Sequence, residues 1–403
     1  SGQILKVFPV PGDKSNKWVS FLEVNQPTGT ALDSIKNVMP FYLNALEKAS
    51  KSNNYELPNS LLKGLNEYQK KYGSAVMLSE SKINSEITYN KYDIFKRLYY
   101  MYMLAGVLML AFCIVQIFKN SKAIRTIINV FHGLIGLFFI LHLAGLIVRW
   151  YISGHAPWSN GYDAIIFISW VGISAGLLLY RNSNALIPAA GFMVAVIMMG
   201  FAHGGSALDP QITPLVPVLK SYWLIVHVAI ITSSYGFFAL SMIIAVISLV
   251  FYIISNKETY KIHHDTTLKE LVIVSEMSLT IGLFALTVGN FLGGIWANES
   301  WGRYWSWDPK ETWAFISIMV YAFVLHMRLV PGLRSRWAFH VATMFAFCSM
   351  VMTYFGVNYY LSGLHSYAAG DPVPVPAWVY IGISTMIILS AISYMKFKAL
   401  TKK

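Results

Sequence analysis

The chain of 403 residues is 56% hydrophobic, 15% aromatic and only 12% charged, with a mean hydropathy of +0.51. This composition excludes an ordinary soluble protein and indicates a polytopic membrane protein. The net charge of +12 therefore bears on membrane topology, and no basic stretch is typical of a nucleic-acid-binding surface. The two cysteines, Cys113 and Cys348, lie in apolar runs and form no CxxC pair, which argues against a disulfide framework or a zinc site.

Residues 1–98 differ in kind from the rest of the chain, with 13 Lys or Arg and 9 Asp or Glu. Residues 4–10 and 18–24 are strand-like, and residues 60–73 and 85–97 are typical of helix or linker. This region is predicted to be part of a water-exposed domain. The chain does not begin with Met and has no signal-peptide pattern, so we expect it to be the C-terminal portion of a longer polypeptide.

From residue 99 onward the chain consists of apolar runs of about 20 residues, the length that spans a bilayer. The predicted spans are 99–118, 127–148, 162–180, 185–203, 223–254, 270–292, 312–328, 337–360 and 377–395. The expected fold is an all-α polytopic membrane protein with about nine transmembrane helices.

Lys and Arg are unevenly distributed between the loops. The positively charged set, with 14 Lys or Arg, comprises 119–126, 181–184, 255–269, 328–336 and the tail 396–403. The other set, with 4, comprises 149–161, 204–222, 293–311 and 361–376. Cytoplasmic loops are enriched in positive charge, so the first set is predicted to face the cytoplasm at every crossing. The second set and the partial N-terminal domain then face outward.

The stretch between the sixth and seventh spans is unusually rich in tryptophan. Residues 301–313, WGRYWSWDPKETW, hold four tryptophans, and Trp296 precedes them. The four charged side chains of this stretch are costly in hydrocarbon, so it is not a membrane span. An interfacial belt needs only one or two indoles. The cluster, with its glycine spacer and Asp-Pro turn, favours an aromatic shelf for a large, flat, apolar ligand with a polar edge.

This stretch resembles the tryptophan-rich WWD motif of haem-handling membrane proteins, most closely the System II cytochrome c synthases, CcsA or the fused CcsBA form. Residues 153–164, SGHAPWSNGYDA, are similar to the GH-x-P-x-SN-x-Y pattern of the same family. The resemblance covers nearly all of residues 99–403. It makes residues 99–118 the last CcsB-type helix, residues 127–395 an eight-helix CcsA-type core, and residues 293–313 an outward WWD loop. Residues 1–98 would be a partial periplasmic domain of the CcsB type.

Two of the ten histidines fall on the outward face beside the tryptophans. His227 lies about one turn inside the fifth span, and His365 lies in the last outward loop. Either one alone is more often a polar residue at a helix end. Their joint placement favours a pair of axial ligands to a haem iron, because neutral imidazole is a usual ligand of that metal. In the family, two outward histidines flank the WWD segment, and His227 and His365 match those positions.

His326 lies 13 residues beyond Trp313, about 20 Å down the seventh span at 1.5 Å per residue. An ionisable residue at this depth is a functional candidate, although a hydrogen bond to a neighbouring helix is the alternative. In the family, a second pair of histidines within the membrane is proposed to hold haem on its way outward, and His326 matches one of them. Its partner in the fused proteins lies in an N-terminal half that is not part of this sequence. Within the chain, His132 and His340 are at compatible depths.

The resemblance implies a holocytochrome c synthase of the bacterial inner membrane. Such an enzyme exports haem b, with ferrous iron, to the periplasmic face and joins its vinyl groups to the CxxCH cysteines of an apocytochrome c. The expected partners are that apocytochrome and an N-terminal CcsB-type portion, fused or separate. The residues predicted to orient the porphyrin are Trp301, Trp305, Trp307 and Asp308, with Trp296, Gly302 and Arg303 as further haem-binding residues. Arg303 and Arg149 could pair with the propionates, or instead extend toward lipid headgroups.

Three other functions are weighed against this one. A haem transporter or chaperone would share the WWD segment but hand haem onward without forming a bond. A non-haem solute transporter with an aromatic substrate site would be colourless when purified. A respiratory b-type cytochrome would need paired histidines at both leaflets on the same two helices, a pattern that this sequence does not show.

Overall fold

A computed structural model of the chain describes residues 5–24, 35–119, 121–180, 184–204, 208–213, 221–260, 264–364 and 374–401. Its internal contacts divide it into two compact units, Ser1–Glu86 and Ile87–Lys403. The division falls before residue 98 because Tyr89, in the helix that precedes the first span, packs against the core of the second unit.

The smaller unit is built on a two-stranded antiparallel sheet. Its elements are β1 (Lys6–Pro9), β2 (Trp18–Ser20), α1 (Phe21–Val24), α2 (Val38–Ser52) and α3 (Glu56–Tyr72), and α4 (Glu80–Tyr92) leads out of it. Phe8, Val19 and Val24 form its small core. Tyr68 and Gln69 of α3 donate hydrogen bonds to carbonyl groups at the first strand, 3.1 and 2.8 Å long. The strand predicted over residues 4–10 is present, and the stretch 60–73, predicted as helix or linker, is helical to Tyr72, whereas the strand-like stretch 18–24 is a strand only to Ser20 and continues as the short helix α1.

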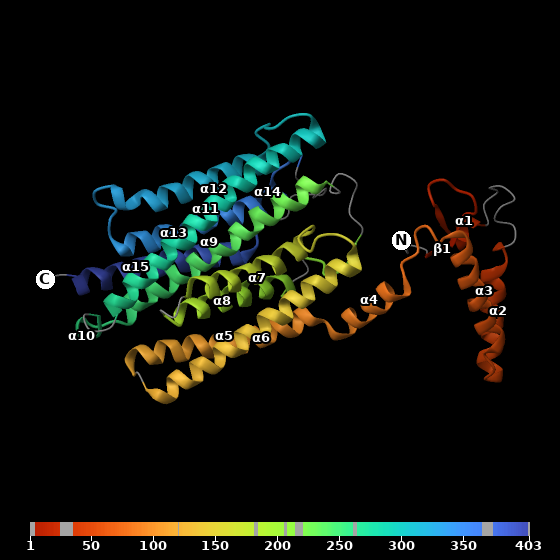
Figure 1. Cartoon of the computed structure of the whole chain (residues 1–403), viewed down its shortest axis with the longest axis horizontal. Coiled ribbons are helices and arrows are strands. Elements are labelled where there is room, and N and C mark those ends of the chain that lie inside the picture. The colour runs from red at the N-terminus through yellow and green to blue at the C-terminus, as the bar shows by residue number, and fades with distance from the viewer. Residues whose placement is uncertain are drawn as a thin grey trace. The chain divides into compact units, whose positions relative to one another are not determined.

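Among the residues described in the larger unit and the helix leading into it, nine helices are long and apolar enough to cross a membrane (Figure 1). They are α5 (Ile94–Phe118), α6 (Lys122–Ser153), α7 (Gly161–Tyr180), α8 (Leu186–His203), α9 (Tyr222–Ile254), α11 (Asp265–Trp301), α12 (Pro309–His326), α13 (Arg336–Val351) and α15 (Ala377–Thr401). A π-helical turn, Met352–Gly356, and α14 (Val357–Tyr360) continue α13, and α10 (Lys257–Thr259) is a short connection. The all-α polytopic fold predicted from the sequence is confirmed.

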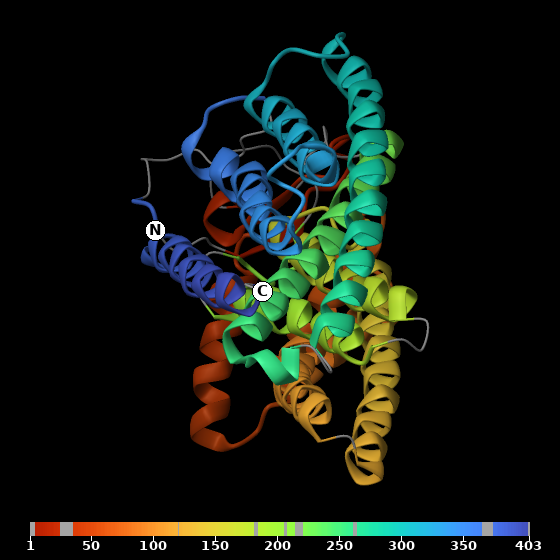
Figure 2. The same cartoon turned by 90° about the vertical axis from the view of Figure 1, so that its left-hand side faces the viewer.

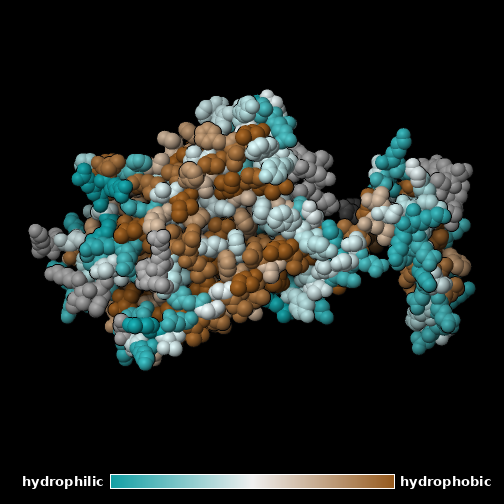
Figure 3. Space-filling view, in the orientation of Figure 1, coloured by the Kyte–Doolittle hydropathy of each residue, from teal (hydrophilic) through white to brown (hydrophobic). Residues whose placement is uncertain are grey.

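The nine helices are not equally buried. Of the residues in the apolar stretch of α7, 72% are buried by the rest of the chain, against 6% in the apolar stretch of α15. Figure 2 shows α15 at one edge of the bundle. Figure 3 shows apolar residues along the flanks of the bundle and hydrophilic residues near α10 and the C-terminus. Exposed apolar flanks on helices of this length suit contact with lipid.

Glycines bring the central helices close together. A Cβ at Gly172 of α7 would lie 2.4 Å from Val194 Cγ1, and one at Gly289 of α11 would lie 2.6 Å from Ile231 Cγ1. Small residues at such interfaces allow the backbones of membrane helices to pack directly on one another. The close approach of α11 to α9 matters for function, because these two helices carry Trp296 and His227.

The Trp-rich segment differs from the loop predicted over residues 293–313. Helix α11 continues through Trp301 and ends at Gly302, whose φ of 72° is left-handed, and α12 begins at Pro309. Trp296 is buried against the rings of His227 and Trp301. This packing gives α11 a buried face beyond residue 292, and the helix therefore continues. The remaining turn, residues 302–308, is short.

Candidate functional site

A cavity of about 270 Å³ lies at the end of the bundle where the Trp-rich turn, the start of α9 and the end of α14 meet. Most of its walls are aromatic or aliphatic. The polar groups that line it include Asn160, His227, Asn290, Lys310, Glu311 and Asn358. An apolar cavity with a few convergent polar groups is typical of a binding site for an organic ligand.

His227 is held in one orientation by its surroundings. Its Nδ1 lies 2.8 Å from the Trp223 carbonyl oxygen, and because that oxygen can only accept, Nδ1 carries the proton. The ring stacks on Trp296, with centroids 5.4 Å apart and planes 28° apart, and the residue is 6% exposed. Gly293 gives it room, since a Cβ there would lie 3.3 Å from His227 Cδ2. This tautomer is the one that ligates a metal through Nε2.

The predicted tryptophan platform is divided between two layers. Trp296 and Trp305 line the cavity. Trp301 lies behind Trp296, with ring centroids 4.7 Å apart and planes at 68°. Trp307 meets Trp305 at 90° but is 68% exposed. Its φ of 59° is left-handed, a conformation that costs a non-glycine residue about 1–2 kcal/mol and that clusters at functional sites.

Asp308 joins two segments of backbone. One carboxylate oxygen caps α12 by accepting from the Lys310 amide at 3.1 Å, and the other accepts from the Leu364 amide at 2.6 Å. The residue is 6% exposed, and a Cβ at Gly363 would lie 2.4 Å from its Oδ1. Asp308 therefore fixes the start of α12 to the chain immediately before residue 365.

Of the other two histidines predicted as ligands, His365 lies outside the described residues, and the structure does not bring His326 to the cavity. His326 is exposed at the end of α12, and its Nδ1 donates to the Ala322 carbonyl at 2.7 Å. Of the two internal partners considered for it, His340 is fully buried and His132 stacks on Tyr180 with centroids 4.9 Å apart.

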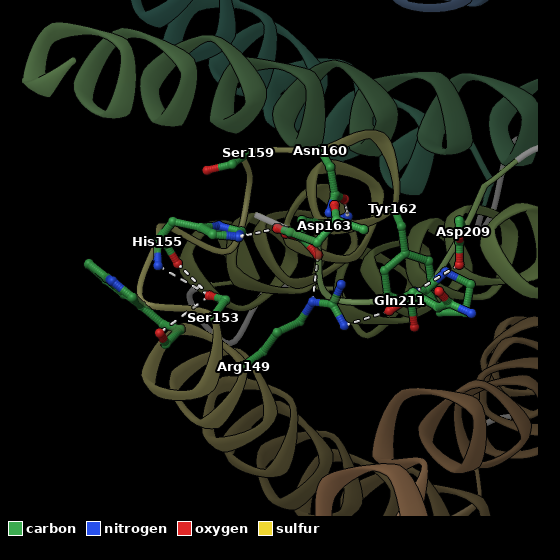
Figure 4. Close-up of polar contacts among 12 residues, drawn as sticks. Arg149, Ser153, His155, Ser159, Asn160, Tyr162, Asp163, Asp209 and Gln211 are labelled. Atoms are coloured by element: carbon green, nitrogen blue, oxygen red, sulfur yellow. Dashed lines mark hydrogen bonds and ion pairs between the residues drawn. The ribbon is translucent and has the colours of Figure 1, made fainter. Parts of the chain in front are cut away.

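Arg149 belongs to a second polar cluster at the same end of α6 and α7. Its Nε donates to Asp163 Oδ1 at 2.5 Å, and its Nη1 donates to the Tyr89 hydroxyl at 3.1 Å and to the Pro210 carbonyl at 2.9 Å. Figure 4 shows the guanidinium between Asp163 and the 209–211 stretch. Arg149 and Asp163 are only 2% and 1% exposed, so their pairing does not support a propionate role for Arg149. Arg303 and Gly302 are exposed on the Trp-rich turn.

Lys310 lines the cavity but received no role from the sequence alone. Its Nζ donates to Asn358 Oδ1 at 2.9 Å and lies 5.9 Å from the centroid of the Tyr354 ring. The signal that could have identified it is the Asp-Pro pair before it. Asp is a favoured N-cap and Pro a favoured first helical residue, so this pair places Lys310 in the first turn of α12.

Comparison with known proteins supplies the family. The family model "Cytochrome C assembly protein" matches residues 158–365, just over half of the chain. The chain belongs to the cytochrome c assembly protein family. It is 41% identical to Protein NrfI of Wolinella succinogenes over 405 residues, covering 98% of this chain and 43% of NrfI. It is 36% identical to the cytochrome c biogenesis protein CcsA of Prochlorococcus marinus strain MIT 9515 over 274 residues, covering 61% of this chain and 85% of CcsA.

A solved structure described as cytochrome c haem lyase CcmF shares the fold, with a TM-score of 0.51 at 14% identity over 76% of this chain and 51% of that one. The sequence-based assignment to a CcsA-type cytochrome c biogenesis protein is confirmed. This chain spans less than half the length of NrfI.

The range matched by the cytochrome c assembly family contains the cavity and the second sequence motif. Trp158, in that motif, donates its indole N–H to the Ile225 carbonyl at 3.0 Å and lines the cavity with Asn160. His155 instead contacts the carbonyl groups of Ala156 and Thr213, at 3.3 and 3.2 Å. The motif therefore forms part of the wall near His227, and His155 serves the backbone of the adjoining loop.

Proposed function

We propose that this chain is the haem-handling part of a cytochrome c synthase. The observation that carries the proposal is His227, fixed in its Nε2-ligating tautomer and stacked on Trp296 in the wall of an aromatic cavity. Haem, written here as the substrate, would lie in that cavity with His227 and His365 as its axial ligands. The donor set suits it, because two neutral imidazoles hold haem iron in a six-coordinate state and the apolar walls suit the ring.

The reaction depends mainly on holding the thiol and the vinyl group in position. A thiol of the CxxCH segment adds across a vinyl group: a C–S bond forms at one vinyl carbon, the thiol proton is transferred to the other, and no electrons are gained or lost. The thiols come from the apocytochrome, since Cys113 and Cys348 lie within α5 and α13. Trp296 and Trp305 orient the ring and exclude water. Fixing both reactants in this way can remove about 7–11 kcal/mol from a barrier.

The same proposal places the cavity at the periplasmic face of a bacterial inner membrane. Its support is the charge asymmetry of the loops, with 14 Lys or Arg on one side and 4 on the side of the Trp-rich turn. His326 then serves as a transfer ligand nearer the cytoplasm. Its exposure on the outside of the bundle supports a second ligand from a CcsB-type portion, fused or separate.

The proposal is tested first by the absorption spectrum of the purified chain. We expect a Soret band that is lost in His227→Gly and His365→Gly and recovered when imidazole is added, because free imidazole can occupy the vacated ligand position. His155→Gly is the matched control, since it removes an imidazole from the same end of the bundle and should leave the spectrum unchanged. A colourless parent protein, or identical spectra in all variants, would contradict axial ligation.

Covalent product separates a synthase from a haem carrier. The chain is expressed with an apocytochrome c, with and without a CcsB-type N-terminal portion, and the cytochrome is scored for haem that survives denaturation. Thioether-linked haem that depends on His227 supports the synthase. Haem-loaded chain without covalent cytochrome in either culture would favour a transporter or chaperone.

A further inference from the structure

The cavity contains a cation, Lys310, that forms no ion pair with a described residue and feels the neighbouring Asp308 carboxylate only through a longer-range electrostatic attraction. Lys310 Nζ donates to the side-chain oxygen of Asn358 at 2.9 Å and lies 5.9 Å from the centroid of the Tyr354 ring. None of the ion pairs between described residues involves Lys310. An amide oxygen and an aromatic face accept positive charge, but neither neutralises it.

The two carboxylates nearest in sequence, Asp308 and Glu311, accept their hydrogen bonds from groups other than the Lys310 ammonium, and Asp308 attracts that ammonium only at longer range. The Asp308 carboxylate accepts from the backbone amides of Leu364 and Lys310. Glu311 Oε2 accepts from the backbone amide of Ser306 at 2.8 Å and from its hydroxyl at 3.3 Å. Both acids therefore stabilise backbone at the turn, although Glu311 also lines the cavity.

Removing a cation from water is costly unless an anion accompanies it. The walls around Lys310 are largely apolar, so a carboxylate brought by the ligand would complete its pairing with a charge-assisted hydrogen bond. We propose that Lys310 is the carboxylate-binding residue of this cavity, and that it recognises a propionate at the edge of the porphyrin. This inference rests on the function proposed above and identifies the propionate as the part of the ligand that is recognised through its charge.

The other basic residues near the cavity do not meet the same requirement. Arg149 is already paired with Asp163, and both are almost fully buried. Arg303 is exposed on the turn, and a surface pair formed there would be screened by solvent. Lys310 combines a cavity-lining position with direct contacts that are neutral, the Asn358 amide and the Tyr354 ring.

The test compares haem with its dimethyl ester, in which both propionates are neutral and the ring and vinyl groups are unchanged. Each is titrated into the purified full chain, and binding is followed by the Soret band. The parent should prefer the free acid by about tenfold or more, equal to about 1.4 kcal/mol. In Lys310→Met this preference should fall to within about twofold of unity while the affinity for the diester is retained, because only the charge-assisted bond is lost.

Two further variants make the result specific. Lys310→Arg keeps the charge and should keep part of the acid preference, whereas Lys398→Met removes an exposed charge that does not line the cavity and should leave the preference unchanged. An unchanged acid-to-ester ratio in Lys310→Met would overturn the inference, as would an equal loss of affinity for both porphyrins, which marks a structural role. A parent that binds neither porphyrin would instead overturn the proposed function.

Discussion

Removing the Asp308 carboxylate should release two backbone segments at once. Asp308→Ala deletes the N-cap of α12, which contributes about 1 kcal/mol. It also deletes the 2.6 Å hydrogen bond from the Leu364 amide, and hydrogen bonds to charged groups contribute roughly 1.5–3 kcal/mol. The residue is 6% exposed, so solvent cannot replace these bonds without local opening. We expect a local loss of about 2.5–4 kcal/mol, well above the effect of an ordinary surface substitution.

Amide hydrogen exchange measures this loss directly. At about tenfold per 1.4 kcal/mol, exchange at the Leu364 amide and in the first turn of α12 should accelerate by roughly 10²–10³-fold in Asp308→Ala. Asp308→Asn keeps an acceptor for either amide and should show a smaller change, and peptides from α7 serve as an internal control. Unchanged exchange at Leu364 in Asp308→Ala would refute the joining role. Equal acceleration throughout the bundle would show global destabilisation instead.

Two further substitutions test the packing of the bundle by thermal unfolding in detergent. Arg149→Met leaves Asp163 buried without its partner and should destabilise by about 3–5 kcal/mol, whereas adding Asp163→Leu should restore much of that loss. A double variant no more stable than the single one would contradict this. Gly172→Ala forces a Cβ to 2.4 Å from Val194 Cγ1 and should destabilise by about 1–3 kcal/mol. Gly133→Ala is the control, since a Cβ there meets nothing within 4 Å, and it should be neutral or stabilising by about 0.5–1 kcal/mol.

The membrane fold was predictable because length and hydropathy are the quantities that a bilayer selects. Each of the nine predicted spans matches a helical segment of the described chain, the fourth beginning one residue early, and several helices continue beyond the predicted spans. Helix α11, predicted to leave the membrane at residue 292, continues to Trp301. Hydropathy reports where a helix can contact lipid, whereas a helix continues for as long as its backbone bonds and buried face are maintained. The packing of Trp296 against His227 supplies that face, and it depends on a contact between two helices.

The site was only partly predictable from residue spacing. The position of His227 near the start of its span was sufficient to place it at the same end of the bundle as the tryptophans, and the structure brings it together with Trp296 and Trp305. The contact between Asp308 and Leu364 spans 56 positions and involves a backbone amide, which no side-chain pattern indicates. The direction in which Trp307 points depends on its left-handed φ, and this conformation is not a preference of tryptophan.

The buried Arg149 and the partly buried Lys310 differ in what the protein supplies to them. Arg149 has a carboxylate, and its loss should be strongly destabilising. Lys310 has an amide and a ring as its direct contacts and only a longer-range attraction to Asp308, so replacing it with Met, which is similar in length and apolar, should change the stability of the unliganded chain by less than about 1 kcal/mol. A residue whose removal leaves the fold intact but abolishes selectivity for a carboxylate has its counterion in the ligand. If Lys310→Met unfolds as readily as Arg149→Met, the ammonium stabilises the fold, and the contrast between the two cations is wrong.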